Sequence, residues 1–487
     1  MKTIQIHPND NVAVALEDLP GIPAGHKIAL CDFAAGDQVV KYGFPIGHTI
    51  HAVSKGSLID HRDIRTNLSG TLDYSGIKCE QALSPKTPPL GGGLQFNGFL
   101  RPDGQVGIRN ELWVIPTVGC VSGIVRRVVE RMRREVWHEG DGVDCVVGFP
   151  HNYGCSQLGD DHENTRRILR DMIYHPNAGG ILVIGLGCEN NQPRLFQEFC
   201  GEYDRERVRF MTCQEVEGDE EEAAMQLLTE LYRKACTCRR SPQPLSKLRI
   251  GLKCGGSDGF SGITANPLLG RFSDWLCTEQ GGTTVLTEVP EMFGAETLLM
   301  RRCATPELLE QTIRLINDFK TYFLSHGQPV GENPSPGNKA GGISTLEEKA
   351  LGCTQKSGSS PVCGVLPYGE RIEEGRGLHL LSAPGNDLVA STALAAAGCQ
   401  LVLFTTGRGT PFATFVPTMK VATNSRLAQG KPHWIDFNAG ALLEGTKMDE
   451  LLLQFRDAVL KVCEGQRTQS ELREQADFAI FKNGVTL

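Results

Sequence analysis

Apolar residues in this chain fall into short runs that end at polar, glycine-rich loops. The clearest case is the run 248 to 252, which is followed by the loop CGGSDGFSGITANP. This run is short, partly β-favouring and bounded by turn signals, so the pattern predicts a buried strand. The small residues directly after it indicate that something approaches the backbone closely there. We therefore take this loop as the first candidate wall of an active site.

The same succession of strand, glycine-rich loop and helix recurs from about residue 97 onward. Strands are predicted at 112–118, 143–149, 180–185, 208–213, 248–252, 283–286, 378–382 and 401–404. Helical spacing predicts helices at 124–136, 163–174, 220–235, 268–279 and 306–325. Strands that alternate with helices need crossover connections, so the pattern predicts an α/β fold with mostly parallel sheets.

Changes in the pattern of apolar runs and turn residues divide the chain into three domains and a linker. Residues 1–70 carry short β-like runs at 3–6, 12–16, 27–30 and 38–42, which predict a small β-rich domain. Residues 71–96 form a linker that contains SPKTPPLGGG at 84 to 93. Residues 97–245 and 246–487 are then two α/β domains, and we expect the active site at a rim that both share.

Composition narrows the function classes. Hydrophobic residues make up 40% and charged residues 22% of the chain, and the net charge is -8, so nothing favours nucleic acid or an anionic membrane surface. The chain has no apolar run of 18 residues and no signal-like start, and we expect a cytoplasmic protein. The 17 cysteines should then be mostly thiols.

Four cysteines come directly after predicted strands, each beside glycine: Cys120, Cys155, Cys188 and Cys254. The carboxyl ends of neighbouring parallel strands meet at one edge of a sheet, so these thiols are expected along one rim. His151, Glu189, Glu288 and Glu291 occupy similar positions. Burial alone explains many cysteines, but thiolate and imidazole together suit iron or zinc. No CxxC pair occurs among them, which disfavours a structural zinc site.

Cations in the same kind of loop indicate the charge of the ligand. Arg109 with Asn110, Lys339, Lys356 and Arg408 all lie in loops that should line the rim. A guanidinium suits a carboxylate or a phosphate. The chain lacks GxxxxGK[ST] and a GxGxxG that opens a helix behind a strand, so nucleotide cofactors are not indicated. A small, oxygen-rich carboxylate is the simplest substrate class.

Long motifs in a fixed order carry a resemblance to a known family. They include RPDGQVGIRNELWVIPTVGC, HNYGCSQLGDDHENTR, GLKCGGSDGFSGITANP, NPSPGNKAGG and LFTTGRGTPFATFVPTMKVATNS. With these blocks the chain resembles the altronate and galactarate dehydratase family, and VGIRNELW, YGCSQLGDDH and CENNQ are most similar to its altronate branch. The N-terminal domain resembles the small SAF (β-clip) domain of that family. Members often carry paired histidines at its end, where this chain has His61 followed by Arg62.

The resemblance implies a hydro-lyase that converts D-altronate to 2-keto-3-deoxy-D-gluconate in hexuronate breakdown, with ferrous iron or manganese as the metal. In this interpretation His151, Cys155, Cys188 and Cys254 lie near the metal. Arg109, Asn110, Lys339, Lys356 and Arg408 bind the carboxylate or hydroxyls, and Ser257, Asp258 and Asn266 bind hydroxyls. His151, Glu189 and Glu288 compete for the role of general base or acid.

Three alternatives remain open at this point. The chain could dehydrate a related sugar acid such as galactarate, or it could bind a polyhydroxy acid without catalysis. It could also be an iron-sulfur hydro-lyase, because several cysteines are expected at one rim. We expect a homo-oligomer, a dimer, and no nucleic acid or membrane partner.

Overall fold

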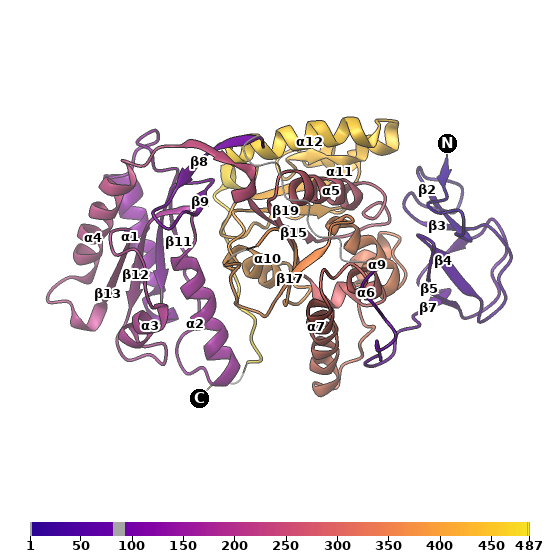
Figure 1. Cartoon of the computed structure of the whole chain (residues 1–487), viewed down its shortest axis with the longest axis horizontal. Coiled ribbons are helices and arrows are strands. Elements are labelled where there is room, and N and C mark those ends of the chain that lie inside the picture. The colour runs from indigo at the N-terminus through magenta and orange to yellow at the C-terminus, as the bar shows by residue number, and fades with distance from the viewer. Residues whose placement is uncertain (1, 81–92, 374, 485, 487) are drawn as a thin grey trace.

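The computed structural model shown in Figure 1 describes residues 2–80, 93–373, 375–484 and 486. The second domain lies at one end of the molecule, the C-terminal domain in the middle and the N-terminal domain at the other end. The N-terminal domain therefore packs against the domain that comes last in the sequence. The predicted linker segment 84 to 93 lies outside the described residues except for Gly93.

The N-terminal domain consists of two small antiparallel sheets, as the β-like runs predict. One sheet has the order β1-β2-β3-β6, with β1 (Thr3–Ile4), β2 (Val12–Ala15), β3 (Lys27–Ala29) and β6 (Leu58–Ile59). The other has the order β4-β5-β7, with β4 (Gln38–Lys41), β5 (Phe44–Thr49) and β7 (Ile64–Arg65). Val12, Val39, Ile46 and Ile59 are buried between them, together with Ala350 and Leu351 of the C-terminal domain. The core of this domain is thus completed by another domain.

The second domain is built on a parallel sheet of order β11-β10-β12-β13. Its strands are β10 (Glu111–Pro116), β11 (Val146–Gly148), β12 (Ala178–Gly185) and β13 (Val208–Thr212). Its helices are α1 (Ser122–Glu135), α2 (Gly159–Ile173), α3 (Pro193–Cys200) and α4 (Glu220–Ala235). A small antiparallel sheet of β14 (Ser241–Pro244), β8 (Gln95–Leu100) and β9 (Val106–Gly107) joins this domain to the next.

The C-terminal domain contains a seven-stranded parallel sheet of order β17-β18-β16-β15-β19-β20-β21. Its strands are β15 (Arg249–Cys254), β16 (Thr283–Leu286), β17 (Val362–Leu366), β18 (Gly377–Leu381), β19 (Leu401–Thr406), β20 (Thr418–Ala422) and β21 (Phe437–Asn438). Its helices are α5 (Ala265–Asp274), α6 (Glu296–Met300), α7 (Pro306–Ser325), α8 (Pro336–Ala340), α9 (Leu346–Cys353), α10 (Asp387–Ala396), α11 (Ser425–Gly430) and α12 (Met448–Cys463). The α/β fold class is confirmed.

The central strand β15 is the one that the sequence marks first, and it is buried along almost its whole length. Strands β16 and β19 pair with it on either side, in parallel. Their loops therefore leave the sheet at the same edge as the loop after β15. The predicted helix 268–279 appears as α5 followed by a π-helical turn over Trp275–Glu279.

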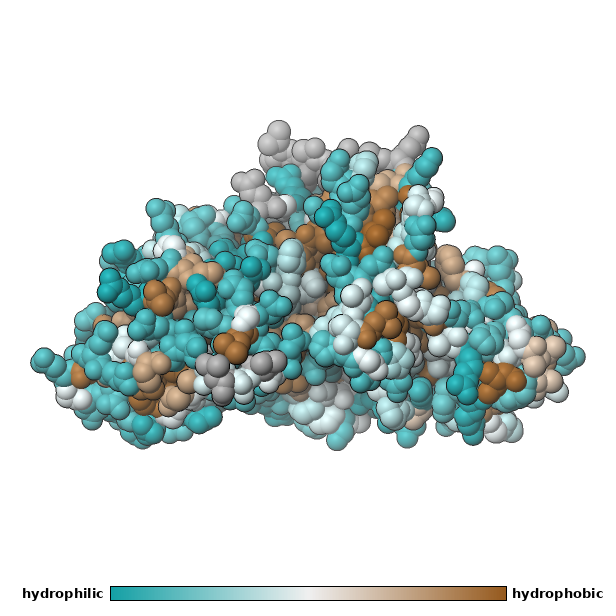
Figure 2. All heavy atoms as spheres, turned by 90° about the horizontal axis from the view of Figure 1, so that it is seen from below, coloured by the Kyte–Doolittle hydropathy of each residue, from teal (hydrophilic) through white to brown (hydrophobic). Residues whose placement is uncertain are grey.

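Aromatic packing fixes the second domain against the C-terminal domain. Trp113 of β10 packs edge-on against Phe149 and against Phe415, with ring centroids 5.4 and 5.6 Å away. All three rings are buried in one core with residues of α2 and α10. Figure 2 shows a mainly hydrophilic face on which hydrophobic residues form separate patches. In the described part of the chain, no helix is long and apolar enough to cross a membrane.

Candidate active site

A polar cavity of about 420 Å³ lies at the carboxyl edge of the seven-stranded sheet. It is lined by Cys254, Gly255, Gly256, Glu291, Asn333, Ser335, Gly337, Asn338, Lys349, Gly385, Asp387 and Arg408. These residues come from the loops after β15, β16, β18 and β19 and from the region of α8 and α9. Open parallel sheets bind ligands at this edge. The cavity is therefore the candidate active site.

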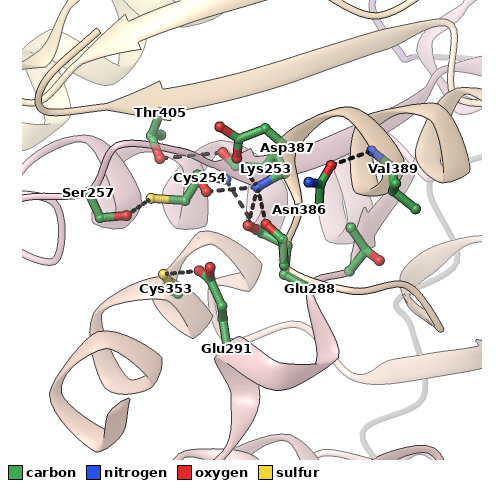
Figure 3. A network of polar contacts seen from close by, with 12 residues as sticks. Lys253, Cys254, Ser257, Glu288, Glu291, Cys353, Asn386, Asp387, Val389 and Thr405 are labelled. Atoms are coloured by element: carbon green, nitrogen blue, oxygen red, sulfur yellow. Dashed lines mark hydrogen bonds and ion pairs between the residues drawn. The ribbon is translucent and has the colours of Figure 1, made fainter. Parts of the chain in front are cut away.

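Strand β15 places a cysteine sulfur in the cavity wall. The strand ends at Cys254, whose Sγ lies 2.7 Å from the hydroxyl oxygen of Ser257 (Figure 3). Glycine is needed next, because a Cβ at Gly255 would lie 2.4 Å from the ring of Phe404 and 2.7 Å from the carboxylate of Asp387. Glycine at position 255 thus lets the loop pass close to Phe404 and Asp387.

A buried charge network lies directly behind Cys254. Glu288 forms an ion pair with Lys253 and a second one with Lys356 at 3.0 Å, and it accepts the backbone N–H of Cys254 at 3.1 Å. Lys253 also pairs with Asp387 at 2.8 Å. Glu288 has a left-handed backbone with φ of 67°, which is unfavourable for a residue with a side chain. Such strain persists where the surroundings fix the residue firmly, as these ion pairs do here.

Burial and the two lysines shift the pKa of Glu288 in opposite directions. Burial raises the pKa of its carboxyl to about 7, although Lys253 and Lys356 pull it down. The two ammonium groups have raised pKa values because Glu288 outweighs the effect of their own burial. Buried charges are stable only when they are paired in this way. The network therefore places two paired ammonium groups close to the cavity.

A second network lines the cavity itself. Lys349 forms an ion pair with Glu291 at 2.7 Å. The thiol of Cys353 donates to Glu291 at 3.1 Å, as Figure 3 shows. Burial opposes the charge of Glu291, but Lys349 and the lysines behind it outweigh burial and lower its pKa to about 2. The neighbouring Cys353, the charge of Lys356 and the hydroxyl of Ser257 hold the pKa of Cys254 well below its usual value, although burial opposes this. The cavity thus combines a thiolate, a carboxylate and an ammonium group.

The structure brings only some of the predicted site residues to this cavity. Cys254 and Arg408 line it, while Glu288 and Lys356 lie in the network behind it. Ser257 contacts the sulfur of Cys254. Lys339 instead lines a neighbouring groove of about 310 Å³ beside the N-terminal domain, together with His61, Arg62 and Arg65.

Asp258 and Asn266 hold the loop after β15 in place. Asp258 accepts hydrogen bonds from Thr423 at 3.0 Å and from Asn424 at 3.1 Å. Asn266 donates to the carbonyl of Gly352 at 2.9 Å and accepts from Thr405 at 2.7 Å. Because their polar groups are occupied within the protein, their contribution to substrate binding is indirect.

Arg109 and Asn110 do not line the cavity, contrary to the prediction. They precede β10 and so lie at the amino end of that strand, opposite the edge where its loop emerges. Arg109 is buried in an ion pair with Glu471 and donates to the carbonyl of Val462 at 2.8 Å. The side-chain amide of Asn110 donates to the carbonyls of Gly142 and Ala235. The VGIRNELW motif thus joins the domains.

The remaining predicted residues gather in the second domain. The loops after β10, β11 and β12 carry Cys120, Cys155 and Cys188, all exposed at the carboxyl edge of that sheet. Hydrogen bonds from Gly119 to Tyr153 and from Asn191 to Gly154 tie these loops together. However, the cavity has no lining residue from the second domain. The two α/β domains therefore have separate rims rather than the shared one that the sequence predicts.

His151 and Glu189 are engaged in holding those loops. The Nε2 of His151 lies 2.8 Å from the carbonyl of Pro116, and its Nδ1 accepts the N–H of Tyr153 at 3.1 Å. Burial lowers the pKa of His151 to about 4. Glu189 accepts from Thr117 at 2.7 Å and from two backbone N–H groups. Neither side chain has a free group that faces the cavity.

The predicted metal ligands are accordingly not assembled. Cys254 lies in the C-terminal domain, whereas His151, Cys155 and Cys188 lie in the second domain. In the ranges that the structure describes, no group of three or more His, Cys, Asp or Glu residues is arranged to hold a metal ion. The sequence reasoning also missed Lys349, Asp387 and Asn338. A lysine inside an apolar strand, Lys253, was an available signal of a buried charge network.

Comparison with known proteins defines the class of this fold and site. Family models match residues 20–67 (altronate/galactarate dehydratase SAF domain), 98–236 (D-galactarate dehydratase/altronate hydrolase, second domain) and 245–486 (D-galactarate/altronate dehydratase, C-terminal). The protein is thus a hydro-lyase with an N-terminal SAF domain. The chain belongs to the D-galactarate and altronate dehydratase family.

Curated relatives match over the full length. The chain is 54% identical to an altronate dehydratase of Bacillus subtilis, covering 99% of both proteins. It is 52% identical to an altronate dehydratase of Escherichia coli, covering 100% of both. A galactarate dehydratase (L-threo-forming) of Escherichia coli is 33% identical over 95% of this chain and 93% of its own length. Similarity is thus greater to the altronate enzymes than to the galactarate enzyme.

Proposed function

We propose that this protein dehydrates D-altronate to 2-dehydro-3-deoxy-D-gluconate in hexuronate breakdown. The observation that carries the proposal is the 54% and 52% identity to two altronate dehydratases along the whole chain. The cavity supports it, because cations and proton-transfer groups converge in a space of about 420 Å³. That volume lies in the range of sites for small ligands.

The reaction requires that a proton leave C2 next to a carboxylate. The developing enolate places a second negative charge on that carboxylate, so the site must hold it with positive charge. Arg408 lines the cavity, and its guanidinium has no ion-pair partner among the described residues. We assign the substrate carboxylate to Arg408.

Two further groups move the protons. Cys254 takes the C2 proton, because its sulfur lines the cavity and its lowered pKa keeps it as a thiolate. Lys349 donates its own proton to the departing C3 hydroxyl, because Glu291 raises the pKa of Lys349 against the effect of burial and keeps it protonated. Water leaves, and the enol that remains tautomerises to the 2-keto acid.

Ferrous iron, or manganese in its place, stays part of the proposal because the family resemblance implies it. The ligand set predicted from the sequence does not fit, because its members lie in two domains and the described residues form no three-residue metal cluster. We therefore route no step of the reaction through a metal. Metal analysis of protein purified without oxygen, with turnover before and after chelation, tests the requirement.

A panel of sugar acids tests the function. Keto-acid formation is measured with altronate, galactarate and their epimers, and altronate should give the highest kcat/KM by at least about tenfold. A preference for galactarate would replace the proposal with its nearest alternative. Altronate binding without any keto acid, in metal-loaded protein, would identify a binding protein instead. Labile sulfide with visible absorbance would indicate an iron-sulfur enzyme.

We also propose a cytoplasmic homodimer. The cysteine content supports a reducing compartment, since all 17 cysteines are free thiols in the structure. Light scattering coupled to size-exclusion chromatography measures the assembly, and a mass of one chain would contradict the dimer.

A further inference from the structure

We infer that the N-terminal domain positions the active-site helix α9, by burying Glu348 of that helix between its own Lys27 and Lys41. The inference rests on the proposed function, because it takes the cavity beside α9 as the site of dehydration. In this role the SAF domain fixes the orientation in which α9 presents Lys349 and Cys353.

Helix α9 contacts the N-terminal domain with some of its side chains and the cavity with others. Glu347 and Glu348 point to the N-terminal domain, where Glu347 accepts from the hydroxyl of Thr66 at 2.9 Å and from the N–H of Asn67 at 2.6 Å. Lys349 and Cys353 both bond to Glu291 on the cavity side. Figure 1 shows α9 on the side of the C-terminal domain that faces the N-terminal domain. Because adjacent residues share a rigid turn, movement of Glu348 moves Lys349 with it.

The contact at Glu348 is fully buried and fully paired. Lys27 Nζ lies 2.8 Å from Glu348 Oε2 and Lys41 Nζ lies 2.7 Å from Oε1, and all three side chains are at most 1% exposed. Lys27 also donates to the carbonyl of Gly342 at 2.8 Å, and the N–H of Ser344 donates to Glu348 at 2.8 Å. Burial opposes the charge of Glu348, but the two lysines outweigh it and lower its pKa to about 2.

Geometry makes this contact specific. A charge in an apolar interface tolerates few alternative positions, because any shift leaves a buried ion without its partner. Here one carboxylate must satisfy two cations from strands β3 and β4, which lie in different sheets of the N-terminal domain. The hydroxyl of Thr345, which caps α9, also donates to the carbonyl of Ile46 in β5. Strands of both sheets thus fix the start of α9.

The N-terminal domain also touches the loop that carries Cys254. A Cβ at Gly259 would lie 1.9 Å from the carbonyl oxygen of Gly25, and a Cβ at Gly262 would lie 2.3 Å from the hydroxyl of Tyr42. Backbone contact this close is possible only because both positions are glycine. The domain therefore contacts two of the segments that form the cavity wall, the loop after β15 and helix α9.

The test compares Glu348→Gln in the full-length protein with a matched control, Lys320→Met. Lys320 forms a buried ion pair with Glu296 at 3.1 Å in the same domain, but on α7, and it does not line the cavity. Two readouts are taken for each variant. One is kcat and KM for altronate. The other is the alkylation rate of individual cysteines by iodoacetamide, measured by peptide mass spectrometry.

We expect Glu348→Gln to lower kcat by at least about tenfold, because a small displacement of a reacting group is costly. Alkylation of Cys353 should accelerate at least about tenfold as α9 opens locally, while the core thiols Cys277 and Cys399 keep their wild-type rates. Lys320→Met should leave kcat and the Cys353 rate unchanged. Wild-type kcat and a wild-type Cys353 rate in Glu348→Gln would overturn the inference.

A milder variant covers the case in which Glu348→Gln does not fold. Lys27→Met keeps the Lys41 pair, and the same changes in kcat and Cys353 alkylation are expected at a smaller size. If this folded variant also matches the wild type in both readouts, the inference is wrong. The alkylation readout is independent of turnover. Absence of keto acid from wild-type protein with altronate would therefore refute the proposed function alone.

Discussion

The second and C-terminal domains both place cysteines at the carboxyl edge of a parallel sheet, yet the cavity that we propose as the active site lies at the edge of the C-terminal sheet. In both domains cysteines lie at or after the end of a strand, and each of these cysteines has a glycine as its neighbour in the sequence. In the second domain Cys120, Cys155 and Cys188 are exposed, and His151 and Glu189 bond to backbone groups. In the C-terminal domain Cys254 is buried among paired charges. The two edges therefore share cysteines near strand ends and differ in the buried ion pairs that surround the cysteine of the C-terminal domain.

The largest expected effect concerns the cavity thiol. Cys254→Ser should lower kcat for altronate by about 10³-fold, because a hydroxyl is a far poorer proton acceptor than a thiolate. Steady-state kinetics measures this, with folding checked by circular dichroism. A kcat within a few fold of wild type would remove Cys254 from the reaction.

The buried ion pairs of Glu288 with Lys253 and Lys356 should contribute strongly to the stability of the C-terminal domain. Glu288→Gln leaves Lys253 and Lys356 without their shared carboxylate, which should cost about 3 to 5 kcal/mol in the free energy of unfolding. Urea denaturation measures the loss. Glu217→Gln is the control, because that side chain is exposed and forms no ion pair among the described residues. An equal, small loss in both variants would show that the network contributes little.

His151 should make the stability of the second domain depend on pH. Burial lowers its pKa from an ordinary 6.5 to about 4, so the unfolded state binds the proton more readily than the folded state. Its contribution to stability is present above pH 6.5 and is lost as the pH falls towards 4, by about 3 kcal/mol at most. In His151→Gln this part of the pH dependence should disappear. An unchanged pH profile of unfolding would place His151 in a more solvated site.

The smallest effects are expected at the exposed thiols. Cys155→Ser and Cys188→Ser should change kcat by less than about twofold and unfolding by less than about 0.5 kcal/mol, because surface substitutions rarely do more. Metal content is measured in the same samples. Loss of iron or manganese together with activity in either variant would restore the second-domain rim as the metal site.

Local pattern was sufficient for much of the fold. The alternation of apolar runs and helical spacing located β10 to β13, β15, β16, β18 and β19, but not β14 or β17, and helices 220–235 and 306–325 match α4 and α7 residue for residue. The β-rich N-terminal domain followed from its short runs and turn residues. The predicted strand 143–149 is longer than β11, because residues 143 to 145 come before the hydrogen-bonded pairing with β10 begins.

Sequence predicted only those residues of the candidate site that lie at or just after the end of a strand. Cys254 is the last residue of β15 and Arg408 lies just after β19, so these neighbouring strands bring them together. Arg109 and Asn110 were misplaced because they lie before β10, at the other end of the sheet. Lys349 was missed because LEEKALGC resembles an ordinary charged helix, and only the docking of α9 shows its orientation. Whether two sheets share a rim depends on domain packing, which no local pattern encodes.

Protection of single cysteines by substrate tests the central claim most directly. Alkylation of Cys254, Cys155 and Cys188 is followed by peptide mass spectrometry at increasing altronate concentration. If the C-terminal cavity is the active site, altronate should slow the alkylation of Cys254 saturably and leave the rates at Cys155 and Cys188 unchanged. Saturable protection of Cys155 or Cys188, with none at Cys254, would place the substrate at the other rim and contradict the account.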